Sequence, residues 1–233
     1  MMEEKFENIS SIKTNFKSTW RSKVFLTFDI DWAHDKVIHD CFELVQAYDV
    51  KSTWFVTNDC NFIKENYSKV EFGIHPNFNS LLELNSNKNA SYTIESLMNL
   101  VPNSTSVRSH SLLTSERLID LFKSFGLTHV SNTYLPYEAR PFNLWDDVTI
   151  VPHEFQDNVE IRLNKKFTNL SRFLDGFHVL NFHPIHVFLN TENLARYEKT
   201  REIHHKPDEL KRYRYKGYGT RNKLLDLLEL LTK

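Results

Sequence analysis

VFLTFDIDW, residues 24–32, predicts a buried β-strand that ends abruptly in two carboxylates. Its valine, leucine, threonine and phenylalanine side chains suit a covered, pleated strand. Asp29 and Asp31 have one residue between them, so in an extended chain both side chains point to the same side. Such a pair is costly unless a cation or a proton lies between the two carboxylates. The alternative is that Asp31 caps the next helix and Asp29 lies in a solvated turn.

The composition limits the class of protein. The 233 residues carry a formal net charge of -1, which offers no basic surface to nucleic acid or to anionic lipid. The chain has 5 glycines and no glycine-rich phosphate-binding motif. Cys41 and Cys60 lack a metal-binding spacing, so we expect reduced, packed thiols. Without an apolar leader or an apolar run of about 18 residues, we expect a cytoplasmic protein with no membrane span.

Strand-like and helix-like patterns alternate along most of the chain, which predicts a parallel sheet with crossover helices. At this length we expect a single-domain α/β fold, a distorted, seven-stranded (β/α) barrel over residues 23–233, after an N-terminal arm at 1–22. A flat, doubly wound sheet is the alternative. The charged stretch 190–218 is expected to be irregular and is a candidate lid. The expected strands are 24–28, 50–56, 70–74, 106–108, 128–131, 148–151 and 177–182, and the expected helices 35–48, 58–67, 93–100, 114–125, 166–174 and 221–231.

Polar side chains that can do chemistry follow four of the expected strands. The carboxyl ends of parallel strands share one face of a barrel, and active sites lie on that face. Taken one at a time, each of these residues has a structural alternative, such as an ordinary ion pair for the arginine or burial in the core for the late histidines. The residues are Asp29 and Asp31, His75, Arg108 and His110, and His183 and His186.

The segment His75-Pro76-Asn77-Phe78-Asn79 suggests a metal site. Proline favours the first position of a helix, so we expect His75 at a helix start and Asn79 about one turn later on the same side. A nitrogen from His75, an oxygen from Asn79 and a carboxylate from Asp31 would give three ligands and an open position, as in a catalytic zinc site. The alternative is that His75 makes ordinary hydrogen bonds at a helix start.

Four segments together resemble the motifs of the NodB-homology polysaccharide deacetylases, a carbohydrate esterase family 4-like group. They are TFDID (27–31), EFGIHPNFN (71–79), RSHSL (108–112) and LNFHP (180–184), and they occur in the order typical of that family. The chain is most similar to the WbmS-like branch, which is found with surface-glycan biosynthesis. The resemblance covers roughly residues 24–231.

The resemblance implies a divalent metal held by Asp31, His75 and the residue at position 79. Zn²⁺ is the first expectation, with Ni²⁺, Co²⁺ or Mn²⁺ as alternatives. Position 79 departs from the family pattern, because this chain has Asn79 where most members have histidine. His110 or His186 could supply a nitrogen instead. His110 is itself a departure, since a proline is usual there.

The resemblance also implies catalytic roles. Asp29 corresponds to the general base, Arg108 is the residue that would orient it, and His183 would protonate the leaving amine. Asp157 resembles, weakly, a residue that tunes the acid histidine. We place four residues around the substrate, namely His110, His186, Trp32 and Asp157.

These features predict a metal-dependent hydrolase that removes an N-acyl group, first of all acetyl, from an amino sugar or glycan precursor in surface-polysaccharide biosynthesis. One alternative is a catalytically degenerate barrel that binds a glycan or a partner, which the substitution at Asn79 would favour. Another is an amidohydrolase, including a deformylase, that acts on a different small amide.

Overall fold

The computed structural model describes residues 5–79, 89–136, 139–145, 147–164 and 170–233. Nine strands form one curled sheet in the order β6-β7-β5-β4-β3-β2-β1-β9-β8. Neighbouring strands are parallel, except for the antiparallel pair β6 and β7. The strands are β1 (Val24–Asp29), β2 (Thr53–Val56), β3 (Glu71–Ile74), β4 (Ser106–Val107), β5 (His129–Val130), β6 (Phe142–Leu144), β7 (Val148–Ile150), β8 (Phe155–Gln156) and β9 (His178–Phe182).

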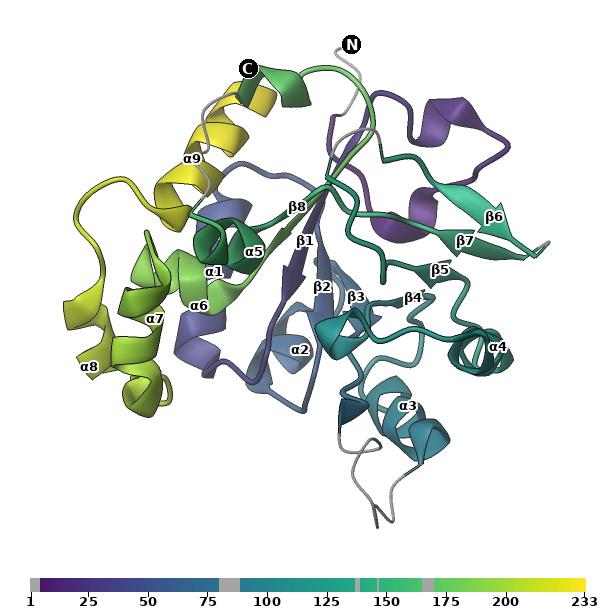
Figure 1. Cartoon of the computed structure of the whole chain (residues 1–233), viewed down its shortest axis with the longest axis horizontal. Helices are drawn as coiled ribbons and strands as arrows, with labels where there is room; N and C mark the ends of the chain where they lie inside the picture. The colour runs from purple at the N-terminus through teal and green to yellow at the C-terminus, as the bar shows by residue number, and fades with distance from the viewer. Residues whose placement is uncertain (1–4, 80–88, 137–138, 146, 165–169) are drawn as a thin grey trace.

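The single-domain α/β barrel expected from the sequence is confirmed as a half-barrel, with nine strands in place of seven. In the described residues β6 and β8 form its two edges, so the sheet curls without closing (Figure 1). The two additional strands are short and come from the aromatic- and proline-rich region between residues 133 and 158. Strands of two or three residues are too short to carry a period-2 pattern.

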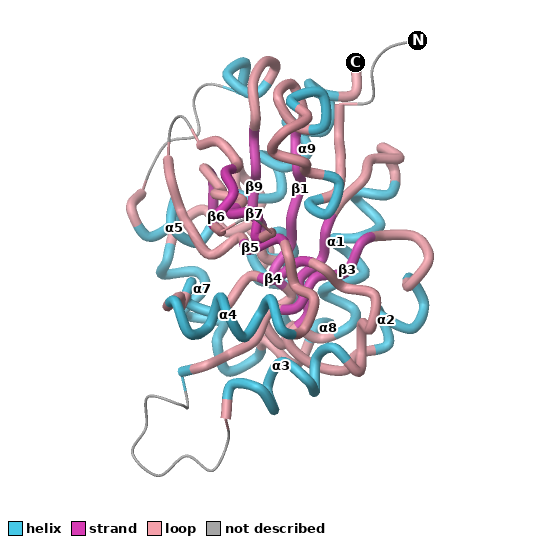
Figure 2. The backbone as a smooth tube through the Cα atoms, turned by 90° about the vertical axis from the view of Figure 1, so that its right-hand side faces the viewer, coloured by secondary structure: helices cyan, strands magenta, loops and turns pink. Residues whose placement is uncertain are grey.

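Helices surround the sheet on its outer side (Figures 1 and 2). The helix α1 follows β1 and packs on α6, which in turn packs on α9. None of the helices in the described ranges has the length and apolar character that crossing a membrane requires. The helices are α1 (Asp35–Gln46), α2 (Asn61–Asn66), α3 (Ala90–Met98), α4 (Glu116–Ser124), α5 (Asp157–Arg162), α6 (Pro184–Leu189), α7 (Leu194–Thr200), α8 (Pro207–Leu210) and α9 (Thr220–Leu231).

Three expectations about local structure need correction. The stretch 190–218 is not irregular, because it contains α7, α8 and two 3-10 turns. Arg214 of this stretch donates to Asp40 of α1 over 3.0 Å, which ties it to the body of the domain. No helix begins at Pro76, since residues 75–78 are non-helical. Of the helix expected at 166–174, residues 165–169 lie outside the described residues, and Leu170–Phe173 is a 3-10 turn.

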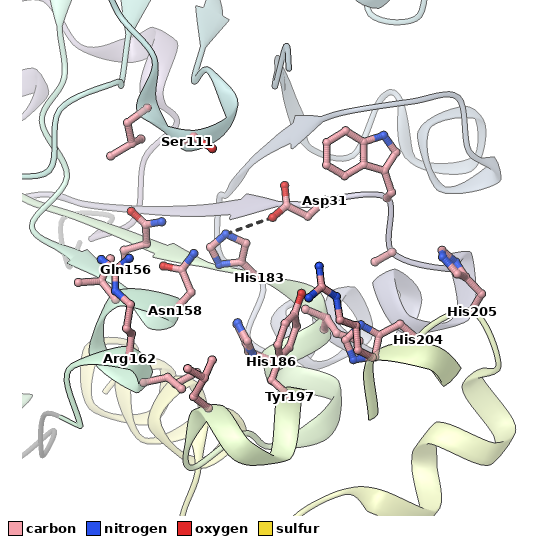
Figure 3. A pocket seen from close by; sticks show the side chains of 18 residues that line it. Asp31, Ser111, Gln156, Asn158, Arg162, His183, His186, Tyr197, His204 and His205 are labelled. Atoms are coloured by element: carbon pink, nitrogen blue, oxygen red, sulfur yellow. Dashed lines mark ion pairs between the residues drawn. The ribbon is translucent and has the colours of Figure 1, made fainter. Parts of the chain in front are cut away.

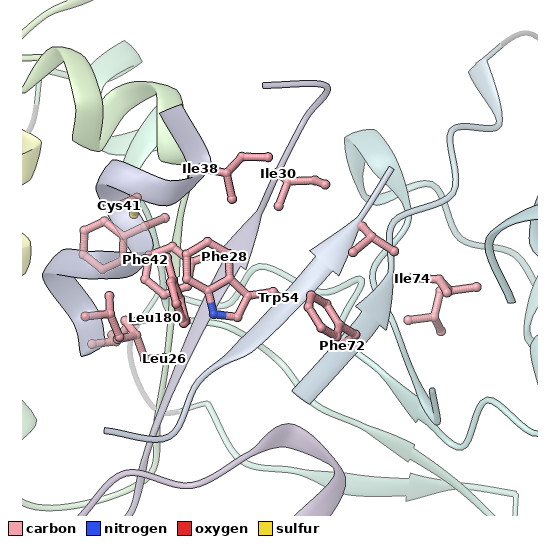
Figure 4. Close-up of a cluster of buried hydrophobic side chains, with 14 of the residues drawn as sticks. Leu26, Phe28, Ile30, Ile38, Cys41, Phe42, Trp54, Phe72, Ile74 and Leu180 are labelled. Atoms are coloured by element: carbon pink, nitrogen blue, oxygen red, sulfur yellow. The ribbon is translucent and has the colours of Figure 1, made fainter. Parts of the chain in front are cut away.

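The strand β1 is buried on both faces and lies between β2 and β9. On its outer face, Phe28 stacks on Trp54 at a centroid distance of 4.2 Å and packs against Phe182. Figure 4 shows this cluster beneath Ile38 and Phe42 of α1. The inner face of the same strand carries Thr27 and Asp29. Hydrophobic packing on the outer face therefore fixes the position of polar groups on the inner one.

The N-terminal arm closes the end of the sheet opposite the carboxyl ends of the strands. Phe6 forms a bridge to Val24 at the start of β1. Farther along the arm, Trp20 packs edge-on against Phe177, which also contacts Phe25. These contacts bury apolar side chains at the base of β1.

Phe28→Ala is expected to lower the free energy of unfolding by about 3–5 kcal/mol, because it leaves a cavity against Trp54. Phe16 is 63% exposed, so Phe16→Ala should change stability by less than about 0.5 kcal/mol. Urea denaturation followed by circular dichroism measures both. Equal losses for the two variants would contradict the packing described here.

Candidate active site

The chain turns sharply after β1 and brings two carboxylates to one histidine. Asp31 and Trp32 adopt left-handed backbone conformations, with φ of 42° and 54°. Asp31 Oδ1 lies 3.2 Å from Nε2 of His75, while Asp29 Oδ1 lies 3.9 Å from Nδ1 of the same ring. The two aspartates therefore flank opposite nitrogens of one imidazole. Neither is a helix cap, because the N-cap of α1 is His34, whose side chain accepts from the Lys36 backbone.

Asp29 is held by a fully buried arginine. Arg108 Nη1 donates to Asp29 Oδ1 over 3.0 Å, and Asn181 Nδ2 donates to Asp29 Oδ2 over 2.7 Å. The same Nη1 also donates to Thr27 Oγ1 and Asn181 Oδ1, while Nε and Nη2 donate to the backbone oxygen and the hydroxyl of Ser131. Burial disfavours the charged form of Asp29, but the positive charge of Arg108, together with His75 and His183, holds the pKa of Asp29 below its usual value. Asp29 is thus an ionised, buried carboxylate whose two oxygens are held by hydrogen bonds.

Asn181 is a site residue that the sequence patterns did not reveal. It lies on β9, two residues before His183, and is fully buried. Its amide donates to Asp29 and its oxygen accepts from Arg108. The available signal was its period-2 relation to His183 at the end of a strand, which puts polar side chains on the inner face.

Asp31, His75 and His110 form a cluster that could hold a metal ion. His110 Nδ1 lies 3.3 Å from His75 Nε2 and 3.3 Å from Asp31 Oδ1. The third distance, from His75 Nε2 to Asp31 Oδ1, is 3.2 Å. Ligands at bond lengths of about 2.0–2.1 Å around a tetrahedral zinc are separated by about 3.3 Å. Asp31 Oδ1 is also buried without a hydrogen bond. The donor set and its spacing therefore fit a divalent metal such as zinc.

Asn79 makes its side-chain contact with the residue that follows His110. It is exposed, and its amide Nδ2 donates to Ser111 Oγ over 3.4 Å. His110 instead reaches the cluster because its backbone N–H donates to Pro76 O over 2.9 Å, which brings the loop after β4 beside His75. The structure therefore offers His110 as a third donor beside Asp31 and His75, and the assignment of Asn79 as a ligand stays a prediction.

His183 faces both aspartates from the end of β9. Its Nε2 lies 3.8 Å from Asp29 Oδ2. The same atom lies 3.6 Å from Asp31 Oδ2, and Figure 3 shows this second pair. Asp157, the first residue of α5, binds its Nδ1 at 2.5 Å and accepts from its backbone N–H at 2.8 Å. Burial alone would lower the pKa of His183, but the carboxylate of Asp157, together with those of Asp31 and Asp29, raises this pKa to about 10. His183 therefore carries a proton on the nitrogen that faces the site.

A cavity of about 780 Å³ opens over Asp31 and His183. Trp32 lines it, is 40% exposed and packs edge-on against His110. His186 lines it farther along, where Nδ1 is 3.3 Å from Thr191 Oγ1. Burial lowers the pKa of His186 to about 4, so this ring is neutral at physiological pH. The cavity thus combines an aromatic face, a neutral imidazole and the charged centre.

The sequence of this chain matches a known protein family. Residues 26–201 match the family model described as "WbmS-like: Polysaccharide deacetylase". The chain is a deacetylase of the polysaccharide deacetylase class. Within that class, it belongs to the WbmS-like family.

Two solved structures resemble the chain. A crystal structure from Bordetella bronchiseptica, described as a polysaccharide deacetylase involved in O-antigen biosynthesis (WbmS), shares 36% identity with a TM-score of 0.93, over 97% of this chain and 98% of that one. A polysaccharide deacetylase structure from Mycobacterium smegmatis has 16% identity and a TM-score of 0.46, over 69% of this chain and 77% of that one. No curated protein matches the chain.

The raised pKa of His183 predicts a pH-dependent contribution to stability. Because the pKa is about 10 in the folded protein against an ordinary value of 6.5, the bound proton stabilises the fold below pH 6.5 and the contribution is lost as the pH rises towards 10. Asp157→Asn removes the counter-charge. In metal-free protein, urea unfolding across this range should therefore show a smaller pH-dependent loss for Asp157→Asn than for the wild type.

The matched control is Asp120→Asn, on the exposed surface of α4. It should keep the pH dependence of the wild type. An unchanged pH dependence in Asp157→Asn would contradict the role given to this carboxylate.

Proposed function

We propose that the protein is a metal-dependent hydrolase that removes an N-acetyl group from an amino sugar of a glycan precursor in surface-polysaccharide biosynthesis. The observation that carries the proposal is the cluster of Asp31, His75 and His110, with the ionised Asp29 and the protonated His183 both directed at it. The similar Bordetella protein is described as involved in O-antigen biosynthesis, which supports a role in surface-polysaccharide biosynthesis.

Asp31, His75 and His110 would hold the metal, with zinc first and nickel, cobalt or manganese as alternatives. A bound divalent ion supplies Lewis acidity, which polarises the acetamide carbonyl and acidifies water. The two histidines would bind through Nε2 of His75 and Nδ1 of His110, the nitrogens that face Asp31. Nδ1 of His75 then keeps its proton, on the side of Asp29.

Asp29 acts as the general base. The buried charge of Arg108 keeps its carboxylate ionised, and Asn181 fixes its second oxygen. A carboxylate in this state can take a proton from the attacking water. Arg108 contacts Asp29 and not the reacting atoms. Its role is to position the general base and to keep it ionised.

His183 acts as the general acid. Its Nε2 carries the proton and faces the same centre, while Asp157 stabilises the imidazolium through Nδ1. The C–N bond of the amide breaks as Nε2 protonates the departing nitrogen, so that water and amide give acetate and the free amine. The base and the acid therefore lie on separate elements, β1 and the end of β9.

The cavity supports a sugar substrate over a very small amide. Its volume of about 780 Å³ lies in the upper part of the range for ligand pockets, roughly 300–1,000 Å³. Trp32 offers an exposed aromatic face beside the site. Removal of formyl instead of acetyl uses the same residues, and a panel of N-formyl and N-acetyl sugars distinguishes the two.

Asp29→Asn is expected to lower kcat by about 10²–10⁴-fold, because the amide cannot accept the proton. The readout is amine release from a panel of N-acetylated amino sugars by zinc-loaded protein, with bound metal measured in parallel. Because Asp29→Asn leaves the buried Arg108 without its counter-charge, a loss of turnover is assigned to the missing base only when the circular dichroism spectrum and the metal content equal those of the wild type. Wild-type turnover in Asp29→Asn, with Asp120→Asn as the control, would refute the assignment.

His110→Ala is expected to weaken zinc binding by at least about 100-fold, whereas Asn79→Ala leaves it close to the wild-type value. Competition with a chromogenic chelator measures both affinities. If Asn79→Ala weakened binding as much as His110→Ala, the third ligand would be Asn79 instead. Failure of the wild type to bind any of the four metals would favour a degenerate binding barrel.

A further inference from the structure

The cavity over the site extends away from the metal cluster towards two arginines. Arg162 is the last residue of α5, and Arg201 follows the last residue of α7. Figure 3 shows Arg162 and Asn158 on one side of His183, and His204 and His205 on the other. We call the Arg162 side of the cavity the α5 wall.

The charges that line this cavity are uneven. Asp31 is the only carboxylate among its described lining residues, and it is a proposed metal ligand. Two arginines, Arg162 and Arg201, line the same cavity. Because the whole chain has a net charge of -1, this excess is a property of the cavity and not of the protein surface in general.

The two arginines differ in how their charge is compensated. Arg201 lies 3.6 Å from Glu198, so part of its charge is balanced on the surface. Arg162 makes no side-chain ion pair or hydrogen bond with any residue in the described part of the chain, and it is exposed. An exposed guanidinium on a cavity wall is suited to bind a carboxylate or phosphate group through two parallel hydrogen bonds.

The position of Arg162 is fixed relative to the acid histidine. The first residue of α5, Asp157, binds His183, and Arg162 ends the same helix. Five helical steps of about 1.5 Å put the two backbones about 7.5 Å apart along the helix axis. A group bound by Arg162 would therefore lie away from the amide that is cleaved, on another part of the same substrate.

We propose that the substrate is an anionic amino sugar, whose carboxylate or phosphate is bound by Arg162 on the α5 wall. The inference rests on the proposed function, because it names the class of substrate for that site. Arg201, which also lines the cavity, contributes a second, weaker positive charge. Binding at a distance from the reacting amide orients the acetamido group over Asp31 and His183.

Titration calorimetry with zinc-loaded Asp29→Asn protein tests this without turnover. The probes are N-acetylglucosamine, its 1-phosphate, its uridine diphosphate ester and an N-acetylated hexosaminuronic acid. At least one anionic probe should bind on the order of tenfold or more tightly than the neutral sugar. A preference for the uronic acid identifies the carboxylate as the bound group, and a preference for the other two identifies phosphate.

The second arm adds Arg162→Gln to the same protein, with Arg117→Gln on the exposed face of α4 as the matched control. Arg162→Gln should abolish the preference for the anionic probe and leave the affinity for N-acetylglucosamine unchanged. Arg117→Gln should preserve the preference. Raising the salt concentration should reduce the preference for the anionic probe in Asp29→Asn protein that keeps Arg162.

The proposal is wrong if no anionic probe binds more tightly than N-acetylglucosamine, or if Arg117→Gln removes the preference as fully as Arg162→Gln. These outcomes do not depend on hydrolysis, because every binding measurement uses protein that carries Asp29→Asn. Conversely, failure of the wild type to release amine would refute the proposed reaction and leave a charge-selective binding result standing.

Discussion

The ion pair between Arg108 and Asp29 is the interaction on which the site depends. An uncompensated buried guanidinium would be strongly destabilising, and removing one partner of such a pair typically costs about 3–5 kcal/mol. Here Arg108 is fully buried and satisfied by groups from β1 and β9 and from the end of β5. The same contacts that satisfy the arginine hold Asp29 ionised. Burial of one cation therefore links contacts between β1, β9 and the end of β5 to the ionised state of a carboxylate.

The elements with a strong period could be predicted from sequence, and the weakly patterned ones could not. The strand at 24–28 and the helix at 35–48 appear as β1 and α1, with ends shifted by one or two residues. The six-residue helices α5 and α6 were missed, whereas α2, which is equally short, was expected at 58–67. The stretch 190–218 was expected to be irregular because its short helices, α7 and α8, are interrupted by charged turns.

Position along the chain predicted which residues meet, but not which atoms face each other. The ends of parallel strands did bring Asp31, His75, Arg108 and His183 together. The spacing of His75 and Asn79 suggested one helical face, yet residues 75–78 are non-helical and Asn79 donates to Ser111. His110 reaches the cluster through a backbone contact between two loops, which no local pattern encodes.

A crystal structure of zinc-loaded protein, with anomalous data collected at the zinc edge, tests the proposed metal centre most directly. We expect one anomalous peak about 2.0–2.1 Å from Nε2 of His75 and Nδ1 of His110, and at bonding distance from Asp31. Asp29 should lie outside the coordination sphere, still paired with Arg108. A peak bound by Asn79 in place of His110, or by Asp29 in place of Asp31, would contradict the assignment.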